Sequence, residues 1–180
     1  MRIVAGAWRG RNLAAPPGNA TRPTADRVRQ ALFDRLMHSS WAGRSVIEGA
    51  SILDAFAGTG ALGLEALSRG GAHATFIEHD RTALATLRAN IAACRAEARC
   101  TVLAADALRP PPGAVQRLLF LDPPYGAGLV LQAVAALAAA GWAGPGTLVV
   151  AELGRDDPLP VADLLDDRSQ GAARMVAWRL

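Results

Sequence analysis

The chain contains no lysine and very little cysteine or tyrosine. All 19 basic residues are arginines, and the 180 residues include 2 cysteines and 1 tyrosine. Two thiols, at Cys94 and Cys100, cannot build a disulfide framework or a zinc site with four thiolates, so we expect them to be structural. We assign no metal ligands.

The sequence also lacks a convincing membrane segment. Its most apolar stretch, 126–141, is mostly alanine and is interrupted by Gln132, which makes it a poor membrane span. The N-terminus lacks the basic start, apolar run and small-residue cleavage site of a secretion signal. We therefore expect no membrane contact and a cytoplasmic location.

Charge is unevenly distributed along the chain. The formal net charge is +3, from 19 basic and 16 acidic residues. Eight arginines fall within 1–45 against only Asp26 and Asp34, so this segment carries +6 and the remainder −3. An arginine-rich segment on a mildly acidic body is typical of an arm that contacts a polyanion. The alternative, genomic base composition, explains the missing lysine better than it explains the clustering.

The length and patterning predict a single domain, 1–180, with an N-terminal appendage. At this length one well-buried α/β domain is expected. Within the appendage, 1–45, we predict a short hairpin from Arg2 to Leu13 and an amphipathic helix from Thr24 to about Met37. The apolar residues at helical spacing are Val28, Ala31, Leu32 and Leu36. Residues 46–180 form the predicted core.

Strand and helix patterns alternate through the core. Short apolar strands separated by helices predict a doubly wound, mainly parallel α/β sheet. The residues 172–180 are strand-like and could add an antiparallel strand. The other expected strands are 51–56, 74–78, 101–105, 117–122 and 147–152, and the expected helices are 61–69, 81–95 and 129–140.

The first core strand leads into a glycine-rich loop that predicts a nucleotide-type cofactor site. Gly58, Gly60 and Gly63 allow a tight turn and bring backbone N–H groups close to a ligand. The spacing also fits a dinucleotide fingerprint. Asp54 before the glycines suits a cationic ligand such as S-adenosylmethionine, which carries a sulfonium and an ammonium group.

Two further strand-end carboxylates belong to the same prediction. Glu78 could accept hydrogen bonds from a ribose diol, and Asp106 is placed to contact an adenine amine. The competing interpretation for these acids, and for Asp54, is that they cap helices or bind loop amides.

The most specific stretch is Asp122-Pro123-Pro124-Tyr125. Consecutive prolines fix an extended backbone without N–H donors, so the element presents acceptors only. The Asp122 carboxylate and the Pro123 carbonyl could bind both hydrogens of an exocyclic amine and favour a pyramidal nitrogen aimed at a methyl group. Tyr125 offers a face for base stacking. A rigid surface turn is the alternative, but the position at a strand end beside the glycine loop argues against it.

These elements together resemble a class I S-adenosylmethionine-dependent methyltransferase. More closely, the chain resembles the bacterial small-subunit rRNA guanine-N2 methyltransferase family, and the similarity spans essentially its whole length. It is carried by residues 6–13, 22–29, 53–70 and 121–125. The resemblance implies a Rossmann-like, mostly parallel seven-stranded sheet with helices on both faces. The family usually has glutamate where this chain has Gln30.

The resemblance also implies roles for individual residues. Arg22, Pro23 and Thr24 would help to close the methionine end of the cofactor, and Asp122 to Tyr125 would hold the target base. The residues implied to hold the cofactor are Asp54, Phe56, Gly58, Gly60, Glu78 and Asp106.

The implied substrate is a specific guanine of 16S rRNA, in the 30S subunit or its assembly intermediate, and we expect a monomer. Trp8 could stack on RNA, or instead anchor the hairpin while one or two arginines pair with core acids. The arginines expected to contact phosphates are Arg2, Arg9, Arg11, Arg27 and Arg29.

Three other functions stay open from the residues alone. The same acceptor geometry would serve an adenine-N6 methyltransferase acting on DNA or RNA. The glycine spacing fits a nicotinamide-dependent oxidoreductase, which leaves the Asp122–Tyr125 element unexplained. A noncatalytic RNA-binding scaffold would not need that element at all.

Overall fold

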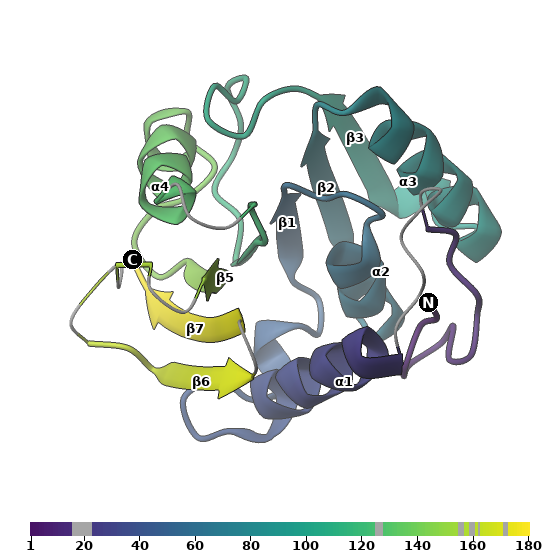
Figure 1. Ribbon diagram of the computed structural model, residues 1–180, viewed down its shortest axis with the longest axis horizontal. Coiled ribbons are helices and arrows are strands. Elements are labelled where there is room, and N and C mark those ends of the chain that lie inside the picture. Colours follow the sequence, from purple (N-terminus) through teal and green to yellow (C-terminus); the bar gives the residue numbers. More distant parts are fainter. Residues whose placement is uncertain (16–22, 125–127, 155–156, 159–160, 162, 171–172) are drawn as a thin grey trace.

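The computed structural model describes residues 1–15, 23–124, 128–154, 157–158, 161, 163–170 and 173–180. Figure 1 shows a central twisted sheet with helices packed around it. No described helix is long and apolar enough to cross a membrane.

Among the described residues, seven strands form one sheet in the order β3-β2-β1-β4-β5-β7-β6. Strands β1 to β5 pair in parallel, whereas β7 pairs antiparallel with both β5 and β6. The predicted seven-stranded, mostly parallel sheet is therefore confirmed. The strands are β1 (Ser51–Ala55), β2 (His73–Glu78), β3 (Cys100–Ala104), β4 (Leu118–Leu121), β5 (Leu148–Gly154), β6 (Asp166–Gln170) and β7 (Ala173–Arg179).

In the described part of the chain, four α-helices cover the two faces of this sheet. They are α1 (Pro23–His38), α2 (Ala61–Ser68), α3 (Arg81–Cys94) and α4 (Leu129–Ala139). Side chains alternate along the buried strands, so Ile52 and Phe120 join the cluster beneath α1, α2 and α3, whereas Leu53 and Leu119 join the cluster beneath α4. This period of two is what a sheet covered on both faces requires.

The N-terminal hairpin is closed by a single bridge rather than by paired strands. Arg2 bridges Asn12, and the Ile3 N–H donates to the Arg11 carbonyl at 2.9 Å. Ile3 is fully buried, which ties the hairpin to the core. Gly6 sits so tightly against α2 that a Cβ there would lie 1.9 Å from the Ser68 carbonyl oxygen.

Helix α1 forms where it was predicted, but it buries only Leu32 and Leu36 of the expected stripe. We expected Val28 and Ala31 on the apolar face, yet Ala31 is exposed and Val28 is only half-buried. The buried positions are Arg29, Leu32, Phe33 and Leu36. The helix is thus rotated so that an arginine enters the core.

Candidate functional site

A cavity of about 450 Å³ opens at the carboxyl ends of β1, β2 and β4. In open parallel sheets this edge, where neighbouring strands lead to opposite faces, is the usual ligand site. The cavity is lined by Phe56, Glu78, His79, Asp80, Asp122, Pro123 and Pro124. The structure therefore brings together five residues that the sequence assigned to cofactor or base binding.

The glycine loop turns sharply at the cavity wall. Phe56 has φ 65°, and Gly58 and Gly60 have φ 53° and 77°, a region that glycine enters freely and phenylalanine rarely does. A Cβ on Gly60 would lie 2.3 Å from the Leu87 side chain on α3. The loop is thus held in a strained, closely packed conformation, which is common where backbone approaches a ligand.

Glu78 ties this loop to the start of α3. Its Oε2 accepts a hydrogen bond from the Gly58 N–H at 2.8 Å, and its Oε1 accepts from the N–H groups of His79 and Asp80, each at 2.8 Å. Glu78 therefore binds loop amides, as the competing interpretation of this acid predicted. Glu78 also lines the cavity, so a carboxylate edge remains next to any ligand there.

Asp54 lies beneath the glycine loop and is not among the residues that line the cavity. It is 2% exposed, and its Oδ2 accepts a hydrogen bond from the Gly63 N–H at 2.8 Å. Burial raises the pKa of Asp54 to about 8; the Gly63 hydrogen bond opposes the shift, whereas Asp122 and Glu78 add repulsion. A cation bound beside Asp54 would relieve this repulsion and favour the ionised form of the carboxyl group.

Asp122 follows β4 and faces the cavity. Protein around the carboxyl group raises its pKa to about 7, and repulsion from Glu152 adds to the shift. Glu152 is its neighbour because β4 pairs with β5 in the register Leu121 opposite Ala151. Pro123 is buried and Pro124 is exposed, so the element spans the boundary between core and cavity.

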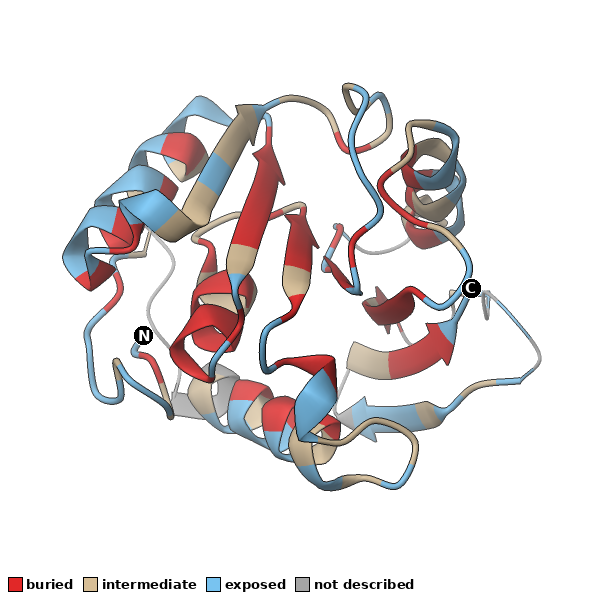
Figure 2. Ribbon diagram, turned by 180° about the vertical axis from the view of Figure 1, so that it is seen from behind, coloured by how far each residue is buried: buried red, intermediate tan, exposed pale blue. Residues whose placement is uncertain are grey.

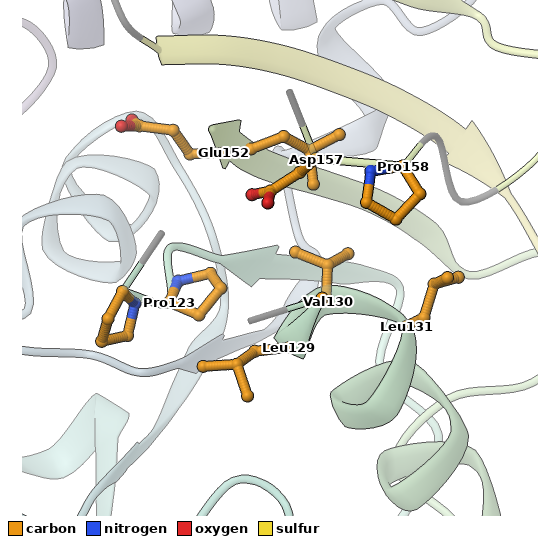
Figure 3. Close-up of a pocket in the computed structure, with 10 residues that line it drawn as sticks. Pro123, Leu129, Val130, Leu131, Glu152, Asp157 and Pro158 are labelled. Carbon is orange, nitrogen blue, oxygen red and sulfur yellow. The ribbon is translucent and has the colours of Figure 1, made fainter. Parts of the chain in front are cut away.

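A second, much smaller pocket lies on the other side of the two prolines. It has a volume of about 10 Å³, enough for about one water molecule. Figure 3 shows Pro123 and Leu129 on one side of it and Glu152, Asp157 and Pro158 on the other. Of these two pockets, the larger has the size of a cofactor site.

Asp106 is the predicted cofactor residue that the structure places apart. It does not line the cavity among the described residues. Its Oδ1 accepts a hydrogen bond from the Leu108 N–H at 2.9 Å, and its Oδ2 lies 3.7 Å from the Arg109 Nε. This is the loop-capping alternative, and a contact with adenine stays a prediction.

The prediction that Arg29 contacts RNA is wrong in this structure. Arg29 is 5% exposed, donates to Asp26 at 2.9 Å, makes a short hydrogen bond to the Arg2 carbonyl and lies 3.7 Å from Glu65. This matches the alternative of an arginine paired with core acids. A guanidinium enclosed by these partners cannot reach phosphate.

The other predicted RNA contacts differ in exposure. Trp8 is half-buried and the Arg99 guanidinium lies 4.8 Å from its ring centre, so it anchors the hairpin; stacking on a base stays a prediction. The exposed arginines are Arg2, Arg9, Arg11 and Arg27.

Some of the predicted site residues lie outside the described part of the chain or at its edge. Arg22 and Tyr125 are outside the described residues. Pro23 and Thr24 form the start of α1, so the segment that was predicted to close the cofactor site is described only from its helical end.

Comparison with known proteins decides the family. The model of the family described as "Conserved hypothetical protein 95" matches residues 1–178. The chain belongs to this family. A relative from Escherichia coli (strain K12), "Ribosomal RNA small subunit methyltransferase D", is 40% identical over 182 residues, covering 100% of this chain and 88% of the relative. The protein of the same name from Haemophilus influenzae is 35% identical and covers 100% of this chain and 92% of the relative.

Solved structures of this type share the fold. A putative methyltransferase from Escherichia coli, 36% identical, superposes with a TM-score of 0.84 over 99% of this chain and 97% of that one. The predicted resemblance to the small-subunit rRNA methyltransferase family is thus confirmed, and with it the class I methyltransferase fold.

One residue without a predicted role is the buried acid that joins the N-terminal elements to the core. Glu65 is 0% exposed, and its carboxylate accepts from the N–H groups of Val4 and Ala5 at 2.8 and 3.0 Å and from Arg69 at 2.8 Å. The Glu65/Arg69 spacing of four on a helix was the available signal. His79 and Asp80 in the cavity wall were missed as well; their position directly after Glu78 was the signal.

Proposed function

We propose that this chain is an S-adenosylmethionine-dependent methyltransferase acting on the exocyclic N2 amine of a specific guanine in 16S rRNA. The main support for this proposal is the composition of the cavity. Phe56 of the glycine loop and Glu78 line it together with Asp122, Pro123 and Pro124. The rRNA substrate is proposed from the name of the relatives from Escherichia coli and Haemophilus influenzae, which are both called ribosomal RNA small subunit methyltransferase D.

The cavity suits a cationic nucleoside cofactor. Glu78, Asp80 and Asp122 line it, and Asp54 lies beneath the loop. Burial raises the pKa values of both Asp54 and Asp122, and repulsion adds to the shift, from Asp122 and Glu78 at Asp54 and from Glu152 at Asp122. A positive charge placed among these carboxylates would therefore be stabilised. A volume of about 450 Å³ is in the range of ligand-sized sites. S-adenosylmethionine, when bound, supplies an electrophilic methyl group.

The chain's contribution to the reaction is position and charge. The Asp122 carboxylate and the Pro123 carbonyl would accept the two hydrogens of the guanine amine and aim its lone pair at the methyl group. As the N–C bond forms and the carbon–sulfur bond breaks, the amine loses one proton, for which Asp122 is the nearest proposed acceptor. Such positioning is the main source of rate in in-line displacement.

Tyr125 would stack on the base, Arg22 with Pro23 and Thr24 would close the cofactor's methionine end, and Asp106 would contact adenine. The base must leave its stack, which costs a few kcal/mol in a duplex. We take 1–180 as one domain, acting as a cytoplasmic monomer on the 30S subunit or its assembly intermediate.

Methyl transfer with Asp122→Ala tests the proposal. Small subunits from a strain lacking the enzyme are incubated with cofactor labelled in the methyl group, and counts in 16S rRNA are measured. We expect the wild-type protein to transfer label and Asp122→Ala to lose it by about 100-fold or more, as when a transition-state hydrogen bond is removed. Asp163→Ala, which removes an exposed carboxylate, is the matched control. Full activity of Asp122→Ala would contradict the mechanism.

Adenine-N6 methylation is the alternative because the same acceptors would bind an adenine amine. Nucleoside analysis of the product separates the two reactions. Tight binding of NAD with no binding of S-adenosylhomocysteine would instead favour the oxidoreductase.

A further inference from the structure

Three exposed arginines recur at seven-residue intervals along α3. They are Arg81, Arg88 and Arg95, the last of which caps the helix. Seven residues at 3.6 per turn return to within about 20° of the starting direction, so Arg81 and Arg88 leave the same side of the helix. At 1.5 Å per residue, the three Cα atoms span about 21 Å. We call this set the α3 stripe.

The α3 stripe carries uncompensated positive charge. Helix α3 contains no acidic residue; Asp80 precedes it and Glu97 follows it. Among the described residues, no hydrogen bond or ion pair holds the side chains of the three arginines, in contrast to the paired guanidinium groups of Arg69 and Arg174. Asp80 is engaged as the N-cap, accepting from the Ala83 N–H at 2.8 Å.

Arg95 has a backbone conformation that is unfavourable for a residue other than glycine. Its φ and ψ are 53° and 45°, the left-handed region that glycine usually fills at the end of a helix. Among the described residues, the other non-glycine with positive φ is Phe56 in the cofactor loop. An arginine in this region costs about 1 kcal/mol relative to glycine, so its presence points to a use for the side chain.

The α3 stripe connects the cavity with the N-terminal hairpin. Arg81 directly follows Asp80, which lines the cavity. At the other end of α3, the Arg11 Nη1 donates to the Ala93 carbonyl at 2.7 Å, and Arg9 and Arg11 are exposed. Figure 1 shows the N-terminal segment running beside the end of α3, and Figure 2 shows that the outer side of this helix is largely exposed.

We propose that the α3 stripe binds the phosphate backbone of the RNA substrate and leads it from the hairpin to the cavity. This inference rests on the proposed function, since it assigns the RNA path at that same site. Three arginines over about 21 Å match a polymer with regularly spaced negative charges, and Arg forms bidentate pairs with phosphate.

Salt-dependent RNA binding tests the α3 stripe. The double variant Arg81→Gln/Arg88→Gln is compared with wild type for binding of in-vitro transcribed 16S rRNA between 50 and 200 mM salt. We expect affinity to fall about tenfold or more at the low-salt end, and the slope of log K against log salt to become shallower by about 1–2. Binding of S-adenosylhomocysteine should not change.

The matched control is Arg44→Gln/Arg168→Gln, which removes the same charge from two arginines whose side chains are 64% and 67% exposed. We expect this control to bind 16S rRNA within about twofold of wild type. Equal losses in both double variants would show a general effect of net charge and overturn the proposal. An unchanged affinity in Arg81→Gln/Arg88→Gln would overturn it as well.

Arg95 provides a test in which stability and binding move in opposite directions. Arg95→Gly relieves the backbone strain, so the melting temperature should rise while RNA affinity falls about threefold or more. Arg95→Lys keeps the charge and should bind RNA nearly as well as wild type. Wild-type affinity in Arg95→Gly would remove Arg95 from the stripe and contradict the inference. Because binding is measured without turnover, these outcomes are distinct from a failure to methylate rRNA.

Discussion

Glu65 and Asp54 are both enclosed by protein, yet their surroundings differ. Glu65 accepts two backbone hydrogen bonds and one from Arg69, and the Arg29 guanidinium lies 3.7 Å away. Asp54 accepts a hydrogen bond from Gly63 and is repelled by Asp122 and Glu78. A carboxylate surrounded by cations holds a fold together, whereas one left short of positive charge is suited to receive a cationic ligand.

The largest expected effect is the loss of stability in Glu65→Gln. This change leaves the buried guanidinium groups of Arg29 and Arg69 without their shared carboxylate, and breaking a buried pair costs about 3–5 kcal/mol. Urea unfolding followed by circular dichroism measures the free energy of unfolding. Glu97→Gln, at an exposed position, should change it by less than about 0.5 kcal/mol. A decrease of under about 1 kcal/mol in the free energy of unfolding of Glu65→Gln would contradict the structural role of Glu65 in this comparison with Asp54.

Asp54→Asn should weaken cofactor binding while leaving the fold intact. A neutral amide still accepts from Gly63 but no longer attracts a sulfonium or ammonium group. We expect affinity for S-adenosylmethionine to fall about 10- to 100-fold, the range for a hydrogen bond or contact involving a charged group. Calorimetric titration measures it. Asp157→Asn is the control, since that side chain accepts from Gly154 outside the cavity; equal losses in both variants would contradict a specific role for Asp54.

The raised pKa of Asp54 should make the free energy of unfolding depend on pH. In the folded state the pKa of Asp54 rises from 3.8 to about 8, so the native state binds this proton more tightly than the unfolded state. Stability from this group is therefore lost as pH rises from about 4 to about 8. Relative to wild type, the free energy of unfolding of Asp54→Asn should therefore increase between about pH 4 and about pH 8. Chemical unfolding at several pH values measures this difference. A difference that does not vary with pH would count against the raised pKa.

A smaller effect is expected in the pH profile of catalysis. Asp122 must be ionised to accept amine hydrogens, and its pKa is raised to about 7 in the free protein. The ratio kcat/KM should therefore rise through pH 7 and level off above it. Removing the charge of Glu152 by Glu152→Gln should shift this rise to lower pH, because Glu152 adds to the raised pKa. A profile that is flat between pH 6 and 8 would exclude this role for Asp122.

Much of the fold could be predicted because its strands are apolar and regularly separated by helices. Each of the five parallel strands begins within one residue of its predicted start. Strand β6, Asp-Asp-Arg-Ser-Gln, was not assigned, since an edge strand can be polar throughout.

The site was predictable where function requires a residue at a strand end, and less so where packing decides. The positions of Glu78 and Asp122 follow from their strands. Arg29 was placed outside because arginines are usually solvated; its burial follows from the rotation of α1, which brings it to Glu65 across the fold. Such a pairing depends on contacts between distant segments, which periodicity along one helix cannot give.

The modified nucleoside formed on unmodified small subunits is the most direct measurement. Purified protein and S-adenosylmethionine are incubated with 30S particles from a strain lacking the enzyme, and 16S rRNA is digested and mapped by mass spectrometry. We predict N2-methylguanosine at a single position, formed by wild type and absent with Asp122→Ala. N6-methyladenosine, or no new methylated nucleoside, would contradict guanine-N2 methylation by this chain.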